Sequence, residues 1–145
     1  MRERGFTLME MVVVLAVLAL VLALVPPLLG GSRARAELEA SARAIVAGLR
    51  ETRALAMTQG RAQVFALDLA KGLYRGAGEK GTQSLPPGVQ SALVTAAGER
   101  IGAAAAGIRF FPDGSSTGGR VTLARDGRRI EIAIDWLTGR IALQE

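Results

Sequence analysis

The sequence predicts an α+β protein in which a long N-terminal helix, membrane-spanning in its first half and amphipathic in its second, packs on a small antiparallel β-sheet head. Three observations predict this fold class. An apolar run without charged or hydrogen-bonding side chains extends from Met11 to Leu29. Helical periodicity follows from Ala34 to about Gln59, and beyond Gly60 the apolar residues alternate with a period of two.

Composition limits the chemistry that the chain can perform. Once the apolar N-terminal segment is set aside, the 145 residues leave room for one modest core and not for a large catalytic cleft. The sequence contains no cysteine and no histidine, which removes disulfides, Ser-His-Asp and Cys-His catalysis and the commonest zinc sites. We therefore expect no enzyme, no cofactor and no metal. The net charge of +5 is compatible with nucleic acid or anionic lipid, and equally with an ordinary solvated surface.

The apolar segment is long enough to cross a membrane. From Phe6 to Leu29 a helix would extend roughly 36 Å, and the hydrocarbon core of a bilayer is roughly 30 Å thick. A secretory signal peptide would have a shorter apolar region that ends in a small-residue cleavage site, whereas this run closes with Pro26, Pro27, Leu28 and Leu29 and contains no A-x-A pattern before a plausible mature start. A buried core helix is disfavoured, because so small a head cannot surround a helix that is apolar on every face.

Glu10 is a charged residue at the start of this segment. A carboxylate in a membrane helix is costly and usually has a partner. The upstream candidates are Arg4 and a new α-amino group created by cleavage. At about 4 Å and an effective dielectric constant of 20 the attraction would be about 4 kcal/mol, enough to offset much of the cost of burying Glu10. The alternative is that Glu10 reaches the cytoplasmic headgroups and has no further role.

The residues around Glu10 match a known pattern. Arg4 to Glu10 (RGFTLME) resembles the leader of type IV prepilins and of type II secretion pseudopilins. The resemblance implies that a prepilin peptidase cuts between Gly5 and Phe6 and methylates the new Phe6 amine. It also implies that Glu10 meets the N-terminal amine of a neighbouring subunit as the helices stack into a filament.

The resemblance divides the chain into four expected parts. These are a cleaved leader (1–5), a transmembrane and assembly helix (6–29), an amphipathic helix (30–60) and a β-rich head (61–145). The leader is net positive and should stay cytoplasmic, although arginines beyond the apolar run weaken this signal. The resemblance then implies a single-pass protein of the inner membrane with a periplasmic or exterior head, which later enters a filament.

The second half of the helix has its own pattern. Pro26 and Pro27, with glycines following, predict a kink or a locally melted stretch over Val25–Ser32, and a plain helix end is the alternative. Beyond it, residues at steps of four and three form one stripe that should pack on the sheet: Leu38, Ala42, Ile45, Leu49, Thr52 and Ala56. Gly60 should end the helix as a C-cap.

Seven strands are expected in the head. They are Val64–Leu69, Leu73–Arg75, Val89–Thr95, Ile108–Phe111, Val121–Ala124, Ile130–Ile134 and Arg140–Leu143. Gly76–Gly88 and Ala96–Gly107 are expected to be loops, and Asp126-Gly127 is a strong hairpin signal. The same face of the second hairpin strand continues to Trp136, which we expect to fill the core, with an exposed place at a subunit interface as the alternative.

Two segments near the C-terminus carry a narrower resemblance. Phe110–Ser116 (FFPDGSS) and Asp135–Ile141 (DWLTGRI) are similar to the GspH/FimT group of minor pseudopilins and minor pilins. Both are mostly turn chemistry and so indicate fold more than function. Some members of the group bind DNA during natural transformation, so the resemblance admits DNA as a partner.

Five arginines lie in or near the hairpin: Arg120, Arg125, Arg128, Arg129 and Arg140. Few aromatic residues accompany them, so any DNA binding would rest on phosphate contacts and would be sensitive to salt. The alternative is a solvated strand edge that resists aggregation.

Three functions remain open at this point. The first is a structural subunit of a type IV pilus or type II secretion pseudopilus, with prepilin peptidase, other subunits, the inner-membrane assembly platform and membrane lipid as partners. The second is a DNA-binding minor pilin for natural transformation. The third is a membrane-anchored enzyme, against which the absence of histidine and cysteine counts.

Overall fold

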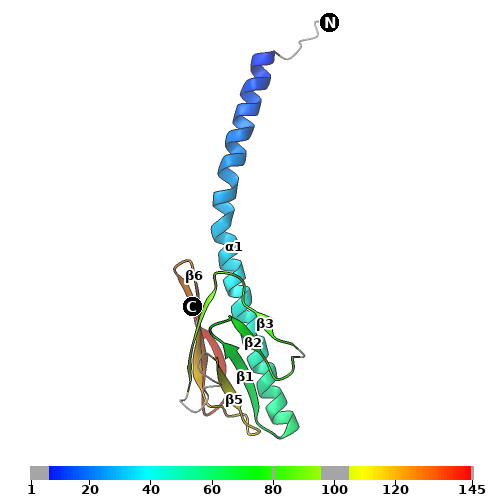
Figure 1. Cartoon of the computed structure of the whole chain (residues 1–145), viewed down its shortest axis with the longest axis vertical. Helices are drawn as coiled ribbons and strands as arrows, with labels where there is room; N and C mark the ends of the chain where they lie inside the picture. The colour runs from blue at the N-terminus through cyan, green and yellow to red at the C-terminus, as the bar shows by residue number, and fades with distance from the viewer. Residues whose placement is uncertain (1–6, 80, 96–104, 145) are drawn as a thin grey trace. The chain divides into compact units, whose positions relative to one another are not determined.

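The computed structural model describes residues 7–79, 81–95 and 105–144, except for the side chains of 23–31 and 105. It divides into two compact units, Met1–Ala34 and Arg35–Glu145. The elements in chain order are α1 (Leu8–Gln59), β1 (Gln63–Asp68), β2 (Leu73–Arg75), β3 (Gln83–Ser84), β4 (Gln90–Thr95), β5 (Ala105–Phe110), β6 (Gly119–Arg125), β7 (Arg128–Ile134) and β8 (Ile141–Gln144) (Figure 1).

In the first unit the helix begins directly after Thr7. The Thr7 hydroxyl oxygen accepts a hydrogen bond from the backbone N–H of Glu10 at 3.2 Å, so Thr7 is the N-cap of α1. The side chains from Thr7 to Leu22 are all exposed. Among the residues that the structure describes, no helix is both long enough and apolar enough to cross a membrane. The transmembrane segment over 6–29 therefore stays a prediction.

The backbone is helical throughout Val25–Ser32. The expected melted stretch and the alternative helix end are therefore both wrong for the single chain. Each proline removes one backbone donor, and the adjoining turns keep the remaining bonds of the ladder. A kink that leaves the helical backbone intact stays a prediction.

In the second unit α1 presents the expected stripe to the core. All six of its residues are buried, from Leu38 to Ala56. Thr52 is polar, but its hydroxyl donates to the Gly48 carbonyl at 2.7 Å and accepts from the Ala77 N–H at 3.1 Å, so burial leaves no unpaired group. Gly60 has a φ of +63°, which confirms the expected C-cap.

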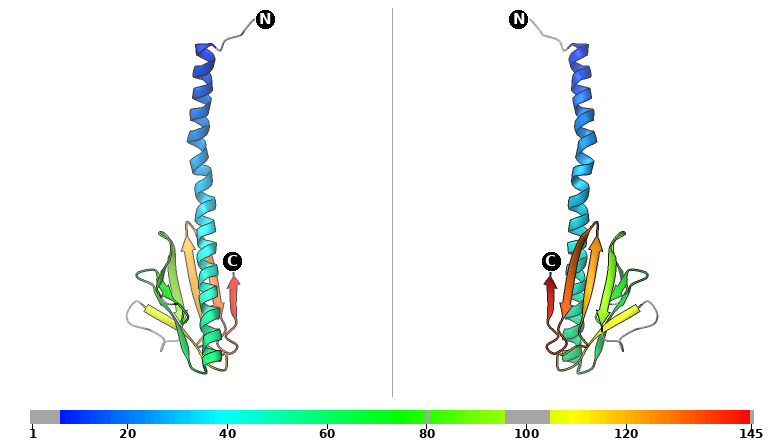
Figure 2. Two further views of the ribbon diagram at one scale, coloured as in Figure 1. Left: turned by 90° about the vertical axis from the view of Figure 1, so that its right-hand side faces the viewer. Right: turned by 90° about the vertical axis from the view of Figure 1, so that its left-hand side faces the viewer.

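The described residues of the head form two antiparallel sheets of four strands each (Figures 1 and 2). Sheet A has the order β3-β2-β1-β5, and sheet B has the order β4-β6-β7-β8. Thr95 links them, because its hydroxyl lies 3.3 Å from the Gly107 carbonyl of β5 and 3.2 Å from the Gly118 carbonyl just before β6.

Two expected loops contain strand residues. The pair Gln83–Ser84 forms β3 on β2, inside the expected loop Gly76–Gly88. The expected loop Ala96–Gly107 is wrong at its end, because β5 starts at Ala105 and pairs with Asp68 of β1. The rest of that loop, 96–104, lies outside the described residues. Pairing with β1 and β2 therefore extends the sheet into segments whose own sequences carry little strand signal.

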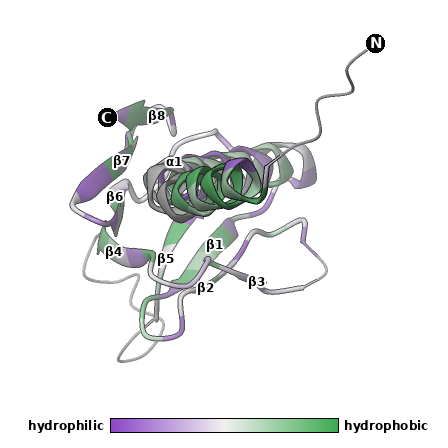
Figure 3. Ribbon diagram, turned by 90° about the horizontal axis from the view of Figure 1, so that it is seen from above, coloured by the Kyte–Doolittle hydropathy of each residue, from purple (hydrophilic) through white to green (hydrophobic). Residues whose placement is uncertain are grey.

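One hydrophobic core joins α1 to both sheets, and strands of both lie around the helix when it is viewed along its axis (Figure 3). The largest buried side chains are Phe65 and Phe110. The inward face expected for the hairpin is confirmed, since Val121, Leu123, Ile130, Ile132 and Ile134 are all buried. At the hairpin turn Asp126 and Gly127 have φ values of 50° and 76°, as a type I′ turn requires.

Trp136 does not fill the core, so that expectation is wrong. Its side chain is 65% exposed. β7 ends at Ile134, and Asp135 starts a turn in which its carboxylate accepts from the Thr138 N–H at 2.8 Å and the Thr138 hydroxyl at 2.7 Å. The strand alternation that would bury Trp136 therefore stops two residues before it.

Candidate functional site

The expected processing and assembly site lies at the start of the chain. Gly5 and Phe6 are outside the described residues, so their roles stay predictions. Glu10 lies in the first turn of α1 and is exposed. Thr7 and Glu10 have the spacing of a capping box, and the Thr7 half of that motif is formed. The Thr-x-x-Glu spacing in the sequence is the signal for this cap.

The expected arginine group separates into two places on sheet B. Arg125, Arg128 and Arg129 lie at the hairpin turn between β6 and β7. Arg120 and Arg140 lie at the other end of the sheet, since five residues of strand span roughly 17 Å. One phosphate backbone would have to run along the hairpin to meet both groups.

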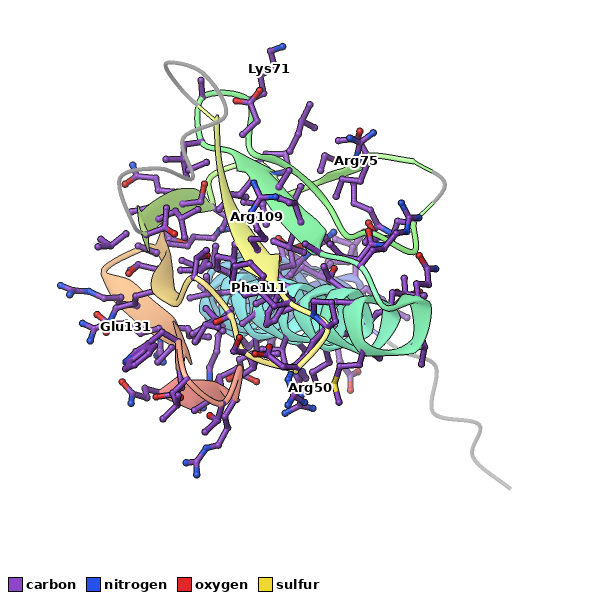
Figure 4. The ribbon with its side chains drawn as sticks, turned by 90° about the horizontal axis from the view of Figure 1, so that it is seen from below. Arg50, Lys71, Arg75, Arg109, Phe111 and Glu131 are labelled. Carbon is purple, nitrogen blue, oxygen red and sulfur yellow. The ribbon has the colours of Figure 1, made fainter. Side chains whose placement is uncertain are left out.

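Three of these arginines have carboxylate partners. Arg120 and Arg129 both contact Glu131, at 3.2 and 3.4 Å, and Arg125 donates to Glu37 of α1. Glu131 lies on sheet B, as Figure 4 shows. These contacts reduce the charge available to a polyanion, so the structure gives the DNA-binding hypothesis no support.

Two Asx turns shape the end of the head. The Asp113 carboxylate accepts from the Ser115 N–H at 2.9 Å and the Ser115 hydroxyl at 2.6 Å. The Asp135 carboxylate binds Thr138 in the same way. The turns are joined through Ser116, whose N–H donates to the Trp136 carbonyl at 2.8 Å. The segments FFPDGSS and DWLTGRI thus form one structural unit.

Arg53 of α1 ties this unit to the helix. Its Nε donates to the Gly114 carbonyl at 3.0 Å, and its Nη2 donates to the Thr138 carbonyl at 3.0 Å. The contacts span 61 and 85 residues of sequence, so periodicity could not reveal them. Arg53 was missed in the sequence because it looked like one more solvated arginine beside the apolar stripe.

Replacing Arg53 with methionine is expected to destabilise the head by about 2 kcal/mol. The substitution keeps most of the apolar stem and removes two hydrogen bonds from a charged donor to Gly114 and Thr138, each worth up to about 3 kcal/mol when buried and less at this half-exposed site. Thermal melts check this. Arg50→Met is the matched control, because Arg50 forms no ion pair with any described residue and should change stability by less than about 0.5 kcal/mol. Equal losses of stability in the two variants would show that the hydrogen bonds of Arg53 do not stabilise the head.

Acid is expected to weaken the two turns. Hydrogen bonds from Ser115 hold the pKa of Asp113 below its ordinary 3.8, and bonds from Thr138, with the charge of Arg140, do the same for the pKa of Asp135. A folded-state pKa below the unfolded one gives stability that is present above the unfolded pKa and is lost as pH falls through the folded pKa. The Tm should therefore decline below about pH 4.

Thermal melts between about pH 7 and about pH 2 measure this decline. The Asp113→Asn/Asp135→Asn double variant should start with a lower Tm and lose less of it on acidification. A decline as steep as that of the parent chain would show that other carboxylates carry the acid sensitivity.

The described residues offer no metal site. No group of three or more His, Cys, Asp or Glu side chains is placed to bind an ion in that part of the chain. The described residues instead offer hydrogen-bonded turns, ion pairs and exposed apolar surface, which suit contact with other proteins.

Known protein families match both the N-terminal segment of the chain and its head. A family described as the prokaryotic N-terminal methylation motif matches residues 1–26, and a family described as type II transport protein GspH matches residues 41–138, more than half of the chain. Type II secretion system protein H of Xanthomonas campestris pv. campestris is 32% identical over 138 residues, which cover 95% of this chain and 81% of that protein.

Solved structures share the fold. The minor pseudopilin EpsH from the type 2 secretion system of Vibrio cholerae has a TM-score of 0.57 and 14% identity, covering 74% of this chain and 96% of EpsH. The type IV minor pilin FimU of Pseudomonas aeruginosa has a TM-score of 0.55 and 17% identity, covering 77% of this chain and 90% of FimU.

A long N-terminal helix on a small antiparallel head, behind a methylation motif, defines a protein with the pilin-like fold that EpsH and FimU share. Among proteins with this fold, the chain belongs to the GspH family of type II transport proteins. Both resemblances seen in the sequence are thereby confirmed. The family consists of structural pseudopilins, and membership implies assembly with other pilin or pseudopilin subunits.

Proposed function

We propose that this chain is a minor pseudopilin of a type II secretion system, made as a membrane precursor and incorporated into a pseudopilus through its N-terminal helix. The observation that carries the proposal is the pairing of an N-terminal methylation motif over residues 1–26 with a GspH match over residues 41–138. Secretion is favoured over a type IV pilus because the relative at 32% identity is a secretion protein, whereas the pilin FimU shares the fold at 17% identity.

The proposed pathway begins with the leader. A prepilin peptidase cuts between Gly5 and Phe6 and methylates the Phe6 amine. The precursor lies in the inner membrane as a single-pass protein with its head in the periplasm. Support comes from the apolar run Met11–Leu29 and from the exposure of every side chain between Thr7 and Leu22, because so continuous an apolar surface marks a contact with lipid or with another protein.

Glu10 has a proposed role in register. It is the charged residue between Thr7 and Leu22, and it is exposed. In a filament core of low dielectric constant, its carboxylate would attract the Phe6 amine of a neighbouring subunit by about 4 kcal/mol at an effective dielectric constant of 20. A subunit docked out of register would bury Glu10 without that partner.

The mass of the mature N-terminal peptide tests the pathway. The full chain is expressed in two matched hosts, one with a prepilin peptidase and one without it, and the membranes are digested for mass spectrometry. A peptide that begins at methylated Phe6 only in the first host is expected. An intact Met1 in both hosts, or a cut beyond Leu29, would refute the pathway.

A further inference from the structure

A positively charged hollow opens at the end of the head, beside the turn between β7 and β8. Its volume is about 1150 Å³. Four guanidinium groups line it: Arg50 and Arg53 of α1, Arg120 of β6, and Arg140. Asp135 is the carboxylate among its lining residues. Figure 4 shows Arg50 projecting outward from the helix at this end of the head.

Part of this positive charge is not neutralised. Arg120 contacts Glu131 at 3.2 Å and the charge of Arg140 acts on the Asp135 carboxylate, but Arg50 and Arg53 form no ion pair with any residue that the structure describes. Arg53 donates to two carbonyl oxygens. Because these acceptors are neutral, they do not cancel its positive charge. The Asp135 carboxylate faces Thr138, from which it accepts two hydrogen bonds. The hollow therefore offers several donors to an anionic group.

Exposed apolar side chains stand beside this charge. Val94 lines the hollow and is 70% exposed, and Trp136 and Leu137, between the lining residues Asp135 and Thr138, are 65% and 63% exposed. The backbone of Trp136 is held in place, because its carbonyl accepts from the Ser116 N–H and its Cβ lies 2.9 Å from where a Cβ on Gly118 would stand. Exposed tryptophan beside arginine is the composition of a protein–protein hot spot.

We infer that this surface, formed by Arg50, Arg140, Trp136, Leu137 and Val94, docks an acidic extended segment of a different protein. Carboxylates of that segment bind the arginines, and one of its apolar side chains packs on Trp136. Val94 and Leu137 favour a protein over a nucleic acid, since aliphatic side chains cannot stack on bases. A second copy of this chain is disfavoured by its net charge of +5. The inference rests on the proposed function in one respect, that the partner is another component of the same assembly.

Trp136 makes the surface directly measurable, because it is the one tryptophan in the sequence. The full chain in nonionic detergent is titrated with a short capped peptide of alternating glutamate and leucine, and the emission of Trp136 is followed. A saturable shift in emission is expected. The matched peptide of glutamine and leucine should bind at least about tenfold more weakly, since it lacks the charge.

Variants locate the binding. The double variant Arg50→Gln/Arg140→Gln should bind the glutamate peptide about tenfold more weakly, which is the effect of losing two exposed ion pairs. Neither side chain donates a hydrogen bond to the turns, and Arg140 acts on Asp135 only through its charge, so the Tm should change only slightly. Lys71→Gln/Arg75→Gln removes two exposed cations on the other side of the head in Figure 4 and should leave binding unchanged.

Equal binding of the two peptides, or equal weakening by both double variants, would overturn the inference. So would tighter binding of single-stranded oligothymidine than of the glutamate peptide at the same arginines, which would assign the hollow to nucleic acid. The mass of the N-terminal peptide separates this result from the proposed function. A chain that matures at Phe6 but does not bind the peptide refutes the docking surface alone, and a chain that binds without maturing refutes the pathway alone.

Discussion

Replacing Glu10 with glutamine is expected to reduce incorporation of this subunit into filaments at least tenfold. The attraction between a carboxylate and an amine about 4 Å apart is about 4 kcal/mol at an effective dielectric constant of 20, and part of it offsets the dehydration of the two charges. A remainder of about 1.4 kcal/mol already gives a tenfold change. Glutamine keeps the size of the side chain and removes its charge, so the effect isolates the electrostatic role.

The helix start should survive this substitution. Thr7 caps α1 through the backbone N–H of residue 10, which glutamine retains, and glutamine is also a normal residue at that position of a capping box. The measurement is the fraction of the subunit recovered with sheared filaments from a host that supplies the other subunits. The N-terminal mass is taken from the same cells to show that maturation is intact.

The matched control is Glu39→Gln. Glu39 lies on the same helix and pairs with Arg35 at 2.7 Å and with Arg43 at 3.4 Å, so its loss removes a carboxylate from α1 without touching the N-terminal segment. Incorporation of this variant should match that of the parent chain. If Glu10→Gln assembles normally, Glu10 has no role in register and its contribution is confined to the first turn of the helix.

Periodicity predicted the parts of the fold in which one face of a regular element meets the core. The helix stripe from Leu38 to Ala56 and the alternation of Ile130, Ile132 and Ile134 are both confirmed by burial. These signals are local, because a single element carries all the residues that the pattern needs. The Asp126-Gly127 turn was predictable for the same reason.

The errors arose where a turn, or a contact between separate segments, overrides the pattern of a single strand. Trp136 fits the alternation of β7, but the Asp135 carboxylate starts a turn that takes Trp136 out of the sheet. The short strand Gln83–Ser84 exists because β2 offers it an edge. The two-sheet arrangement depends on Ala105–Phe110 pairing with β1, across a separation of some forty residues that no local pattern encodes.

The candidate sites differ in the same respect: local spacing was enough to predict the leader, but not to predict how the arginines are arranged. The leader was recognisable because Gly5, Phe6 and Glu10 have a fixed spacing before an apolar run, and the family match over residues 1–26 agrees. The arginine group was predicted only because these arginines lie close together in the sequence. The structure places Arg120 and Arg140 at one end of sheet B and Arg125 at the other, where it binds Glu37. Charge neutralisation of this kind is visible only when distant segments are brought together.

Replacing Gly139 with alanine is expected to destabilise the head by about 4 kcal/mol. Gly139 has a φ of +61°, where a side chain costs about 1–2 kcal/mol. An added Cβ would also overlap the Gly114 carbonyl oxygen and lie 2.8 Å from Nε of Arg53. Those atoms form one of the two bonds that tie the turns to α1, so making room for the methyl group breaks a hydrogen bond from a charged donor, worth about 1.5–3 kcal/mol.

Gly127→Ala separates the backbone cost from the overlap. Gly127 has a φ of +76°, but a Cβ there would meet no atom within 4 Å, so this variant should lose only the 1–2 kcal/mol of backbone strain. Thermal melts of the two variants measure the difference, at about 4–8 °C of Tm per kcal/mol for a domain of this size. Combining Gly139→Ala with Arg53→Met should cost less than the sum of the two, because both remove the same tie. Additive losses would mean that Gly139 acts on the turn alone and that the close approach of Gly114, Gly139 and Arg53 does not hold the end of the head together.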